Sequence, residues 1–178
     1  MAKMFSHLFL FILGLSLFLK GSPVLAQEKT AQSSAIMISS QEIKDTRGER
    51  LREFFQSYQS PLAPYADFIV KTADDYSLDW KLVPAIAGVE STFGKFIPYN
   101  SFNAYGWNNG DFYFENWQEG IEVVSKNLKE NYIDKWGAKT VGEIGAIYAP
   151  PSPFWAGRVA YFMGEIEAFE PSSLQFTL

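Results

Sequence analysis

Glu90 is the residue whose surroundings best suit it to acid chemistry. The segment before it, residues 79–89, starts with an aspartate that can cap a helix and continues as an apolar run with no polar face. A helix here would be buried on all sides, and Gly94 would end it. Burial disfavours the charged form of a carboxylate, so the pKa of Glu90 should rise and its proton should persist near neutral pH. The pattern predicts a general acid, against the alternative of a carboxylate satisfied by backbone amides or by Lys95.

The residue inventory excludes several other kinds of catalytic site. The chain has no cysteine, and its one histidine, His7, lies in a segment that we predict to be removed. Without these residues the chain can build neither a Ser-His-Asp nor a Cys-His site, nor a zinc centre with the usual ligands. The remaining chemistry is that of carboxylates, tyrosines, lysines and amides. We therefore expect no metal and no cofactor.

The N-terminus has the pattern of a secretory signal. Residues 1–26 contain Lys3, an apolar run over 8–19 and a small-residue site that ends at Ala26, so we predict a signal peptide. The alternative is an uncleaved anchor, but the run is short against the about 20 residues that span a bilayer. We predict a flexible tether over 27–45, one domain over 46–170 and a tail over 171–178, and a secreted or cell-envelope location.

The composition and net charge of the chain limit the kinds of partner that it can bind. The chain has 178 residues, 47% of them hydrophobic, and a formal net charge of −5. Loss of residues 1–26 would remove two lysines and no acid, and an acidic domain is a poor partner for nucleic acid or anionic lipid. We expect a monomer that binds no nucleic acid and meets a membrane only through the signal segment during export.

Helical periodicity and capping signals recur along residues 46–170. Two capping boxes are present, Thr46 with Glu49 and Thr140 with Glu143, and each predicts a helix start. Asn116 can cap a third helix, and Ser152, followed by a proline, can cap the last one. The expected fold is mainly α, with five or six helices around the buried helix that carries Glu90.

Residues 95–115 lack a helical period. They hold eight aromatic residues, and Asn108-Asn109-Gly110 separates residues 104–107 from residues 111–114; this pattern predicts one small β-hairpin. The aromatic side chains are too many to bury in so short a segment, and flat rings beside amides suit the faces and hydroxyl groups of sugars. We predict that some of them line a cleft.

Four motifs carry a family resemblance. LDWKLVPAIAGVESTFGK, NAYGW, FENWQEGIEVV and IYAPPSPFW follow in this order over roughly residues 60–168. The chain resembles the lysozyme-like superfamily of peptidoglycan-cleaving enzymes, and most closely the bacterial glucosaminidase type, the mannosyl-glycoprotein endo-β-N-acetylglucosaminidase-like domain. Soluble lytic transglycosylases are related to it. The resemblance implies a lysozyme-like α+β fold.

The resemblance also implies roles for individual residues. Glu90 matches the general acid, and Tyr148 matches a tyrosine near the acid and the sugar. Asn103, Tyr105 and Gly106 match an Asn-x-Phe-Gly element that lines the cleft, with tyrosine here in place of the usual phenylalanine. The predicted sugar-contacting side chains further include Trp107, which replaces a usual isoleucine, together with Tyr113 and Trp155.

Glycoside cleavage generally uses two carboxyl groups. The second one could be Glu115, Asp111 or Glu122, in this order of preference, but attack by the sugar's own N-acetyl or hydroxyl group would need no second acid. The predicted function is an exported glycosidase that cleaves β-1,4 bonds of peptidoglycan or a related N-acetylhexosamine polymer. The alternatives are a lytic transglycosylase on the same glycan and a non-catalytic glycan-binding module of the cell wall. The IYAPP segment lacks the Asn and Gly of the corresponding transglycosylase element, which counts against the first alternative.

Overall fold

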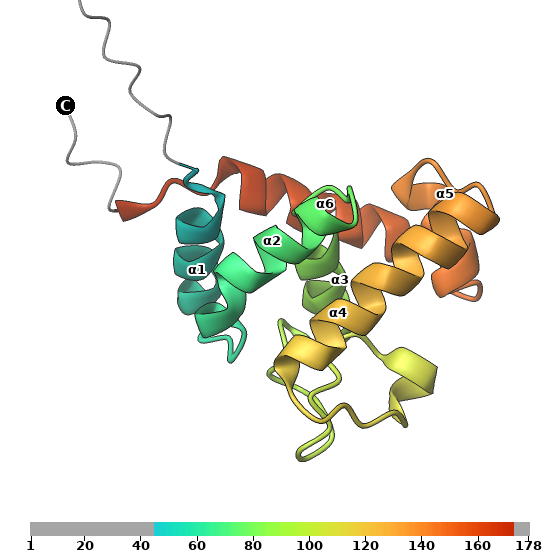
Figure 1. The fold of residues 1–178 in the computed structure, drawn as a ribbon, viewed down its shortest axis with the longest axis horizontal. Coiled ribbons are helices and arrows are strands. Elements are labelled where there is room, and N and C mark those ends of the chain that lie inside the picture. Colours follow the sequence, from blue (N-terminus) through green and yellow to red (C-terminus); the bar gives the residue numbers. More distant parts are fainter. Residues whose placement is uncertain (1–44, 173–178) are drawn as a thin grey trace, which may run out of the picture. The chain divides into compact units, whose positions relative to one another are not determined.

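The computed structural model describes residues 45–172, which belong to one compact unit. The predicted signal peptide and nearly all of the predicted tether and tail lie outside the described residues. The described part contains six α-helices: α1 (Arg47–Ser57), α2 (Ala66–Asp75), α3 (Leu82–Ser91), α4 (Trp117–Asn127), α5 (Val141–Tyr148) and α6 (Trp155–Ala168) (Figure 1). A π-helical segment, Leu128–Lys135, continues α4. The predicted mainly helical fold with five or six helices is confirmed. None of the helices in residues 45–172 combines the length and apolarity that crossing a membrane requires.

Helix α3 is buried around most of its circumference, as its sequence predicts. Eight of its residues are buried, including Pro84, which stands in the first turn where its missing N–H is not needed. Helix α6 packs against α3 and crosses it (Figure 1). The approach is close at Gly88, where a Cβ would lie 2.6 Å from the ring of Phe93 and 3.0 Å from that of Phe162.

The end of α3 is fixed by its backbone and by an aromatic cluster. Thr92, Phe93 and Gly94 all have positive φ, and the Phe93 N–H donates back to Ala87 O at 2.9 Å. The hydroxyl of Ser60 donates to Phe93 O at 2.7 Å. The Phe93 ring is fully buried and packs against Phe54, Phe55, Tyr58 and Phe162. The last turn of α3, which carries Glu90, is therefore held in one conformation.

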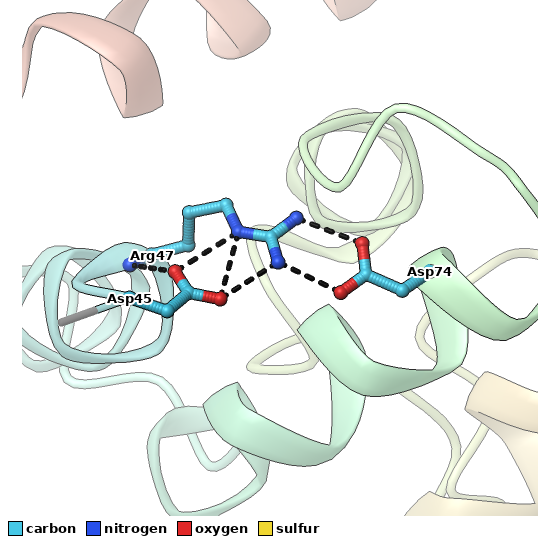
Figure 2. A network of polar contacts seen from close by, with 3 residues as sticks. All are labelled: Asp45, Arg47 and Asp74. Atoms are coloured by element: carbon cyan, nitrogen blue, oxygen red, sulfur yellow. Dashed lines mark hydrogen bonds and ion pairs between the residues drawn. The ribbon is translucent and has the colours of Figure 1, made fainter. Parts of the chain in front are cut away.

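The start of α1 is joined to the end of α2 by an ion-pair network (Figure 2). Arg47 donates to both oxygens of Asp74 at 2.8 and 2.7 Å, and also to Asp45. These bonds hold the pKa of Asp74 and of Asp45 below the usual range. The predicted side-chain cap by Thr46 is wrong. Asp45 takes that role instead, because its carboxylate accepts the Arg47 N–H at 3.0 Å.

Two other predicted caps are confirmed. Asn116 accepts from the Glu119 N–H at 2.9 Å. Thr140 and Glu143 form a reciprocal capping box at the start of α5. The predicted Ser152 cap is wrong, because α6 begins at Trp155 and no side chain caps it.

The predicted β-hairpin does not form. Within residues 95–115 the structure has no strand, and Trp107–Gly110 form a short 3-10 turn. Asn108, Asn109 and Gly110 do have the positive φ that the hairpin turn requires. However, the Asn103 side chain donates to Trp107 O and Phe112 O, both at 3.0 Å, and accepts from Trp107 N–H at 2.9 Å. One amide side chain thus takes backbone groups that a strand ladder would use.

Candidate active site at the end of helix α3

A groove of about 530 Å³ opens at the end of α3. Glu90 and Ser91 form part of its lining, together with residues of the 96–110 loop and of the turn at 148–151. Among the described residues that line this groove, Glu90 is the one with a carboxylate. The chain segment that resembles a catalytic motif therefore borders an open space large enough for a sugar unit.

Glu90 is partly buried and has one strong side-chain partner. The indole Nε1–H of Trp155 on α6 donates to Oε1 of Glu90 at 2.6 Å. Burial raises the pKa of Glu90, and the hydrogen bond from Trp155 lowers it in part. Burial is the larger influence, and Lys95 has no part in the shift. A raised pKa means that the proton is retained to higher pH, which is the property of a general acid.

The loop after α3 approaches the carboxyl group with its backbone. Gly106 has a φ of +62°, and a Cβ at this position would lie 2.8 Å from Oε2 of Glu90. The hydroxyl of Ser91, next to Glu90, lies 2.7 Å from Ala104 O and ties the loop to α3. Glycine is required here both for its conformation and for the space that it leaves to Glu90.

Tyr148 connects the loop to the indole that holds Glu90. Its hydroxyl donates to Tyr105 O at 2.6 Å, and its ring stacks on Trp155 with centroids 5.0 Å apart and planes at 24°. Burial, aided by the charge of Glu90, raises the pKa of Tyr148 well above its usual value. The phenol therefore stays protonated at neutral pH and acts as a hydrogen-bond donor. Tyr148 also lines the groove, as the resemblance implies.

Three of the predicted sugar-contacting side chains lie in the protein interior. Tyr105 is 1% exposed and Trp155 is 3% exposed, so neither ring can stack on a sugar. The Tyr105 hydroxyl is buried without a hydrogen-bond partner among the described residues. Asn103 is also buried and organises the loop, although it contributes to the groove lining. These three residues stabilise the site from the protein interior instead of contacting the sugar with their rings or exposed surface.

The candidates for a second carboxylate lie elsewhere. Glu115 and Asp111 are exposed and do not line the groove. Glu122 accepts a hydrogen bond from the hydroxyl of Tyr76, the residue after α2, at 2.5 Å. Tyr113, predicted to contact sugar, is 58% exposed and is not part of the lining either.

A second hollow of about 360 Å³ adjoins the groove, and the two share Gly106, Asn109 and Tyr148. Trp107, Asn108 and Tyr132 complete its walls, so the predicted Trp107 contributes to this hollow. Tyr132 was not among the predicted sugar-contacting residues. Tyr132 follows α4 in the π-helical segment, whose altered turn could not be anticipated from the period.

Phe96 also lines the groove and was not among the predicted sugar-contacting residues. It is 74% exposed and borders the groove. The available signal was its place immediately after the Gly94-Lys95 turn. No group of three or more His, Cys, Asp or Glu within residues 45–172 is arranged to hold a metal ion.

Comparisons with known proteins leave the family open. No protein-family model matches the chain, and no curated protein matches it.

Proposed function

We propose that the protein is an exported glycosidase that cleaves β-1,4 bonds of peptidoglycan or a related N-acetylhexosamine polymer, with Glu90 as the general acid. The observation that carries this proposal is the partly buried Glu90 carboxyl group, with its raised pKa, at the edge of the groove. The carboxyl proton would be given to the glycosidic oxygen as the bond to the anomeric carbon breaks. The family resemblance of the motif around Glu90 supports the same chemistry.

The walls of the groove suit a neutral, hydroxylated polymer. Phe96 offers an exposed ring, and Asn109 and Gly106 bring an amide and a backbone to the same space. Stacking of a ring on the apolar face of a sugar and hydrogen bonds to its hydroxyl groups are the interactions that such a lining provides. The adjoining hollow beside Trp107 and Tyr132 offers room for a further sugar unit.

Among the lining residues that the structure describes, Glu90 alone carries a carboxylate, and this favours a reaction without a protein nucleophile. In one form, the N-acetyl group of the substrate attacks the anomeric carbon, and water later hydrolyses the intermediate. In the other, a hydroxyl group of the same sugar attacks, which gives an anhydro sugar. The lytic transglycosylase is therefore the second candidate function, and this lining is the observation that favours it.

Digestion of cell-wall sacculi tests the proposal. The purified protein and its Glu90→Gln variant are incubated with sacculi, and clearing and soluble products are followed by mass spectrometry. We expect products from the wild type alone, because glutamine keeps the shape of the side chain but has no acidic proton. Products that have gained water indicate hydrolysis, and anhydro products indicate transglycosylation. Equal activity of both proteins would refute the role of Glu90. Binding of both without any product would identify a glycan-binding module instead of an enzyme.

A further inference from the structure

The two oxygens of Glu90 have different surroundings. Oε1 accepts the indole N–H of Trp155 at 2.6 Å, inside the protein. Oε2 lies on the side of Gly106, which borders the groove. Gly106 has no side chain that could cover this oxygen. The carboxyl group is thus held on one side and open on the other.

Trp155 is itself fixed from several directions. It is 3% exposed, and its ring lies so close to α5 that a Cβ on Gly145 would be 2.9 Å away from it. On another side it stacks on Tyr148, whose hydroxyl is anchored on Tyr105 O at 2.6 Å. An indole held in this way cannot follow a moving carboxyl group, so the carboxyl group must adopt the orientation that the indole sets.

We infer that Trp155 is the positioning residue of Glu90, and that it makes Oε2 the oxygen that carries the transferable proton. An indole N–H can only donate a hydrogen bond. A proton on Oε1 would therefore place one donor against another in a buried contact, whereas a proton on Oε2 leaves the hydrogen bond to Oε1 intact. The inference rests on the proposed function where it concerns catalysis, but the pairing of Trp155 with Glu90 is a property of the fold.

The same hydrogen bond affects the acidity of Glu90. A donor to Oε1 stabilises the charged form more than the neutral one, so it opposes the effect of burial. On the neighbouring helix α5, Tyr148 interacts with the charge of Glu90, and its raised pKa keeps it neutral at neutral pH. Burial and this hydrogen bond are the two causes of the shift, so loss of the indole donor should raise the pKa of Glu90 further.

Trp155→Phe in the full chain tests the inference, because phenylalanine keeps an aromatic ring but has no donor. We expect kcat on sacculi to fall about 10- to 100-fold, since a shift of about 1 Å in a catalytic group can cost about 100-fold. KM should change little, because Trp155 does not reach the groove. The alkaline limb of the pH profile of kcat/KM should move to higher pH. Trp117→Phe is the matched control, because this ring packs on Gly94 and Phe102 and leaves Glu90 untouched; its pH profile should equal that of the wild type.

Tryptophan fluorescence gives a readout that needs no activity. Protonation of a carboxyl group in contact with an indole changes its emission, so the wild type should show a fluorescence transition at the pKa of Glu90. This transition should disappear in both Trp155→Phe and Glu90→Gln and persist in Trp117→Phe. Its absence from the wild type, or an unchanged kcat and pH profile in Trp155→Phe, would overturn the inference. If the wild type shows the transition but releases no product from sacculi, the proposed function fails while the pairing stands.

Discussion

Gly106→Ala isolates the contact between the loop and the acid. Gly106 has a φ of +62°, and the added Cβ would lie 2.8 Å from Oε2 of Glu90. Ordinary contact between carbon and oxygen begins about 0.5 Å farther out. Because Trp155 holds Oε1, the carboxyl group cannot rotate away without losing that hydrogen bond. A displacement of this size should reduce kcat about tenfold, given that about 1 Å can cost about 100-fold.

The substitution also has a cost that is unrelated to Glu90. An alanine at positive φ is destabilised by about 1–2 kcal/mol, offset in part by about 0.4–1 kcal/mol from the restricted unfolded chain. Gly137→Ala is the matched control, because Gly137 has a φ of +77° and a Cβ there would meet nothing within 4 Å. Both variants should lose about 1 kcal/mol of unfolding free energy in urea titrations. Only Gly106→Ala should lose kcat on sacculi. Full activity in Gly106→Ala, or an equal loss in both variants, would refute the steric argument.

Three further outcomes are expected. Tyr105→Phe removes a buried hydroxyl that has no partner within the described part of the chain, and it keeps the carbonyl that binds Tyr148. The free energy of unfolding should therefore rise by about 1 kcal/mol in urea titrations. A decrease would mean that the hydroxyl has a hydrogen-bond partner in solution. Glu90→Gln should have a higher Tm than the wild type at pH 8, because the pKa of Glu90 is raised in the folded state. The contribution of Glu90 to stability is complete below the ordinary glutamate pKa of about 4.3, and it is lost as the pH rises through the folded pKa. That difference in Tm should shrink towards pH 4, and a difference independent of pH would contradict the burial argument. Phe96→Ala should raise KM about fivefold with kcat unchanged, because it removes about 40 Å² of apolar contact with the sugar, worth about 1 kcal/mol. Tyr99→Ala is the control and should not change KM, because this ring is 89% exposed and lines no groove described above.

Features of this fold that depend on neighbouring residues could be predicted from the sequence. The apolar run before Glu90 predicts that α3 is buried. The caps at Asn116 and Thr140 are predicted from each capping residue and the residue three positions after it. The Thr46 prediction failed because an aspartate one position earlier competes for the helix start and is itself held by Arg47.

The features that could not be predicted depend on contacts between distant residues. Trp155 lies 65 positions after Glu90, so its hydrogen bond to the acid appears only when α6 is packed on α3. The hairpin prediction rested on the turn residues, whose positive φ is correct, but a single side chain at position 103 takes the backbone partners of the expected strands. Local sequence patterns thus predicted the position of the acid, whereas the residues that hold it in place could be identified only from tertiary contacts.

The loop that faces Glu90 has an uneven tolerance to change as a consequence of its construction. Within the loop, the amide of Asn103 alone holds Trp107 N–H, Trp107 O and Phe112 O, which a strand ladder would pair with main-chain groups. Exposed positions such as Tyr113, whose side chain takes no part in these bonds, can therefore be substituted without altering the path of the chain. Loss of the Asn103 amide, by contrast, would leave all three of these backbone groups without their partner in a single mutational step.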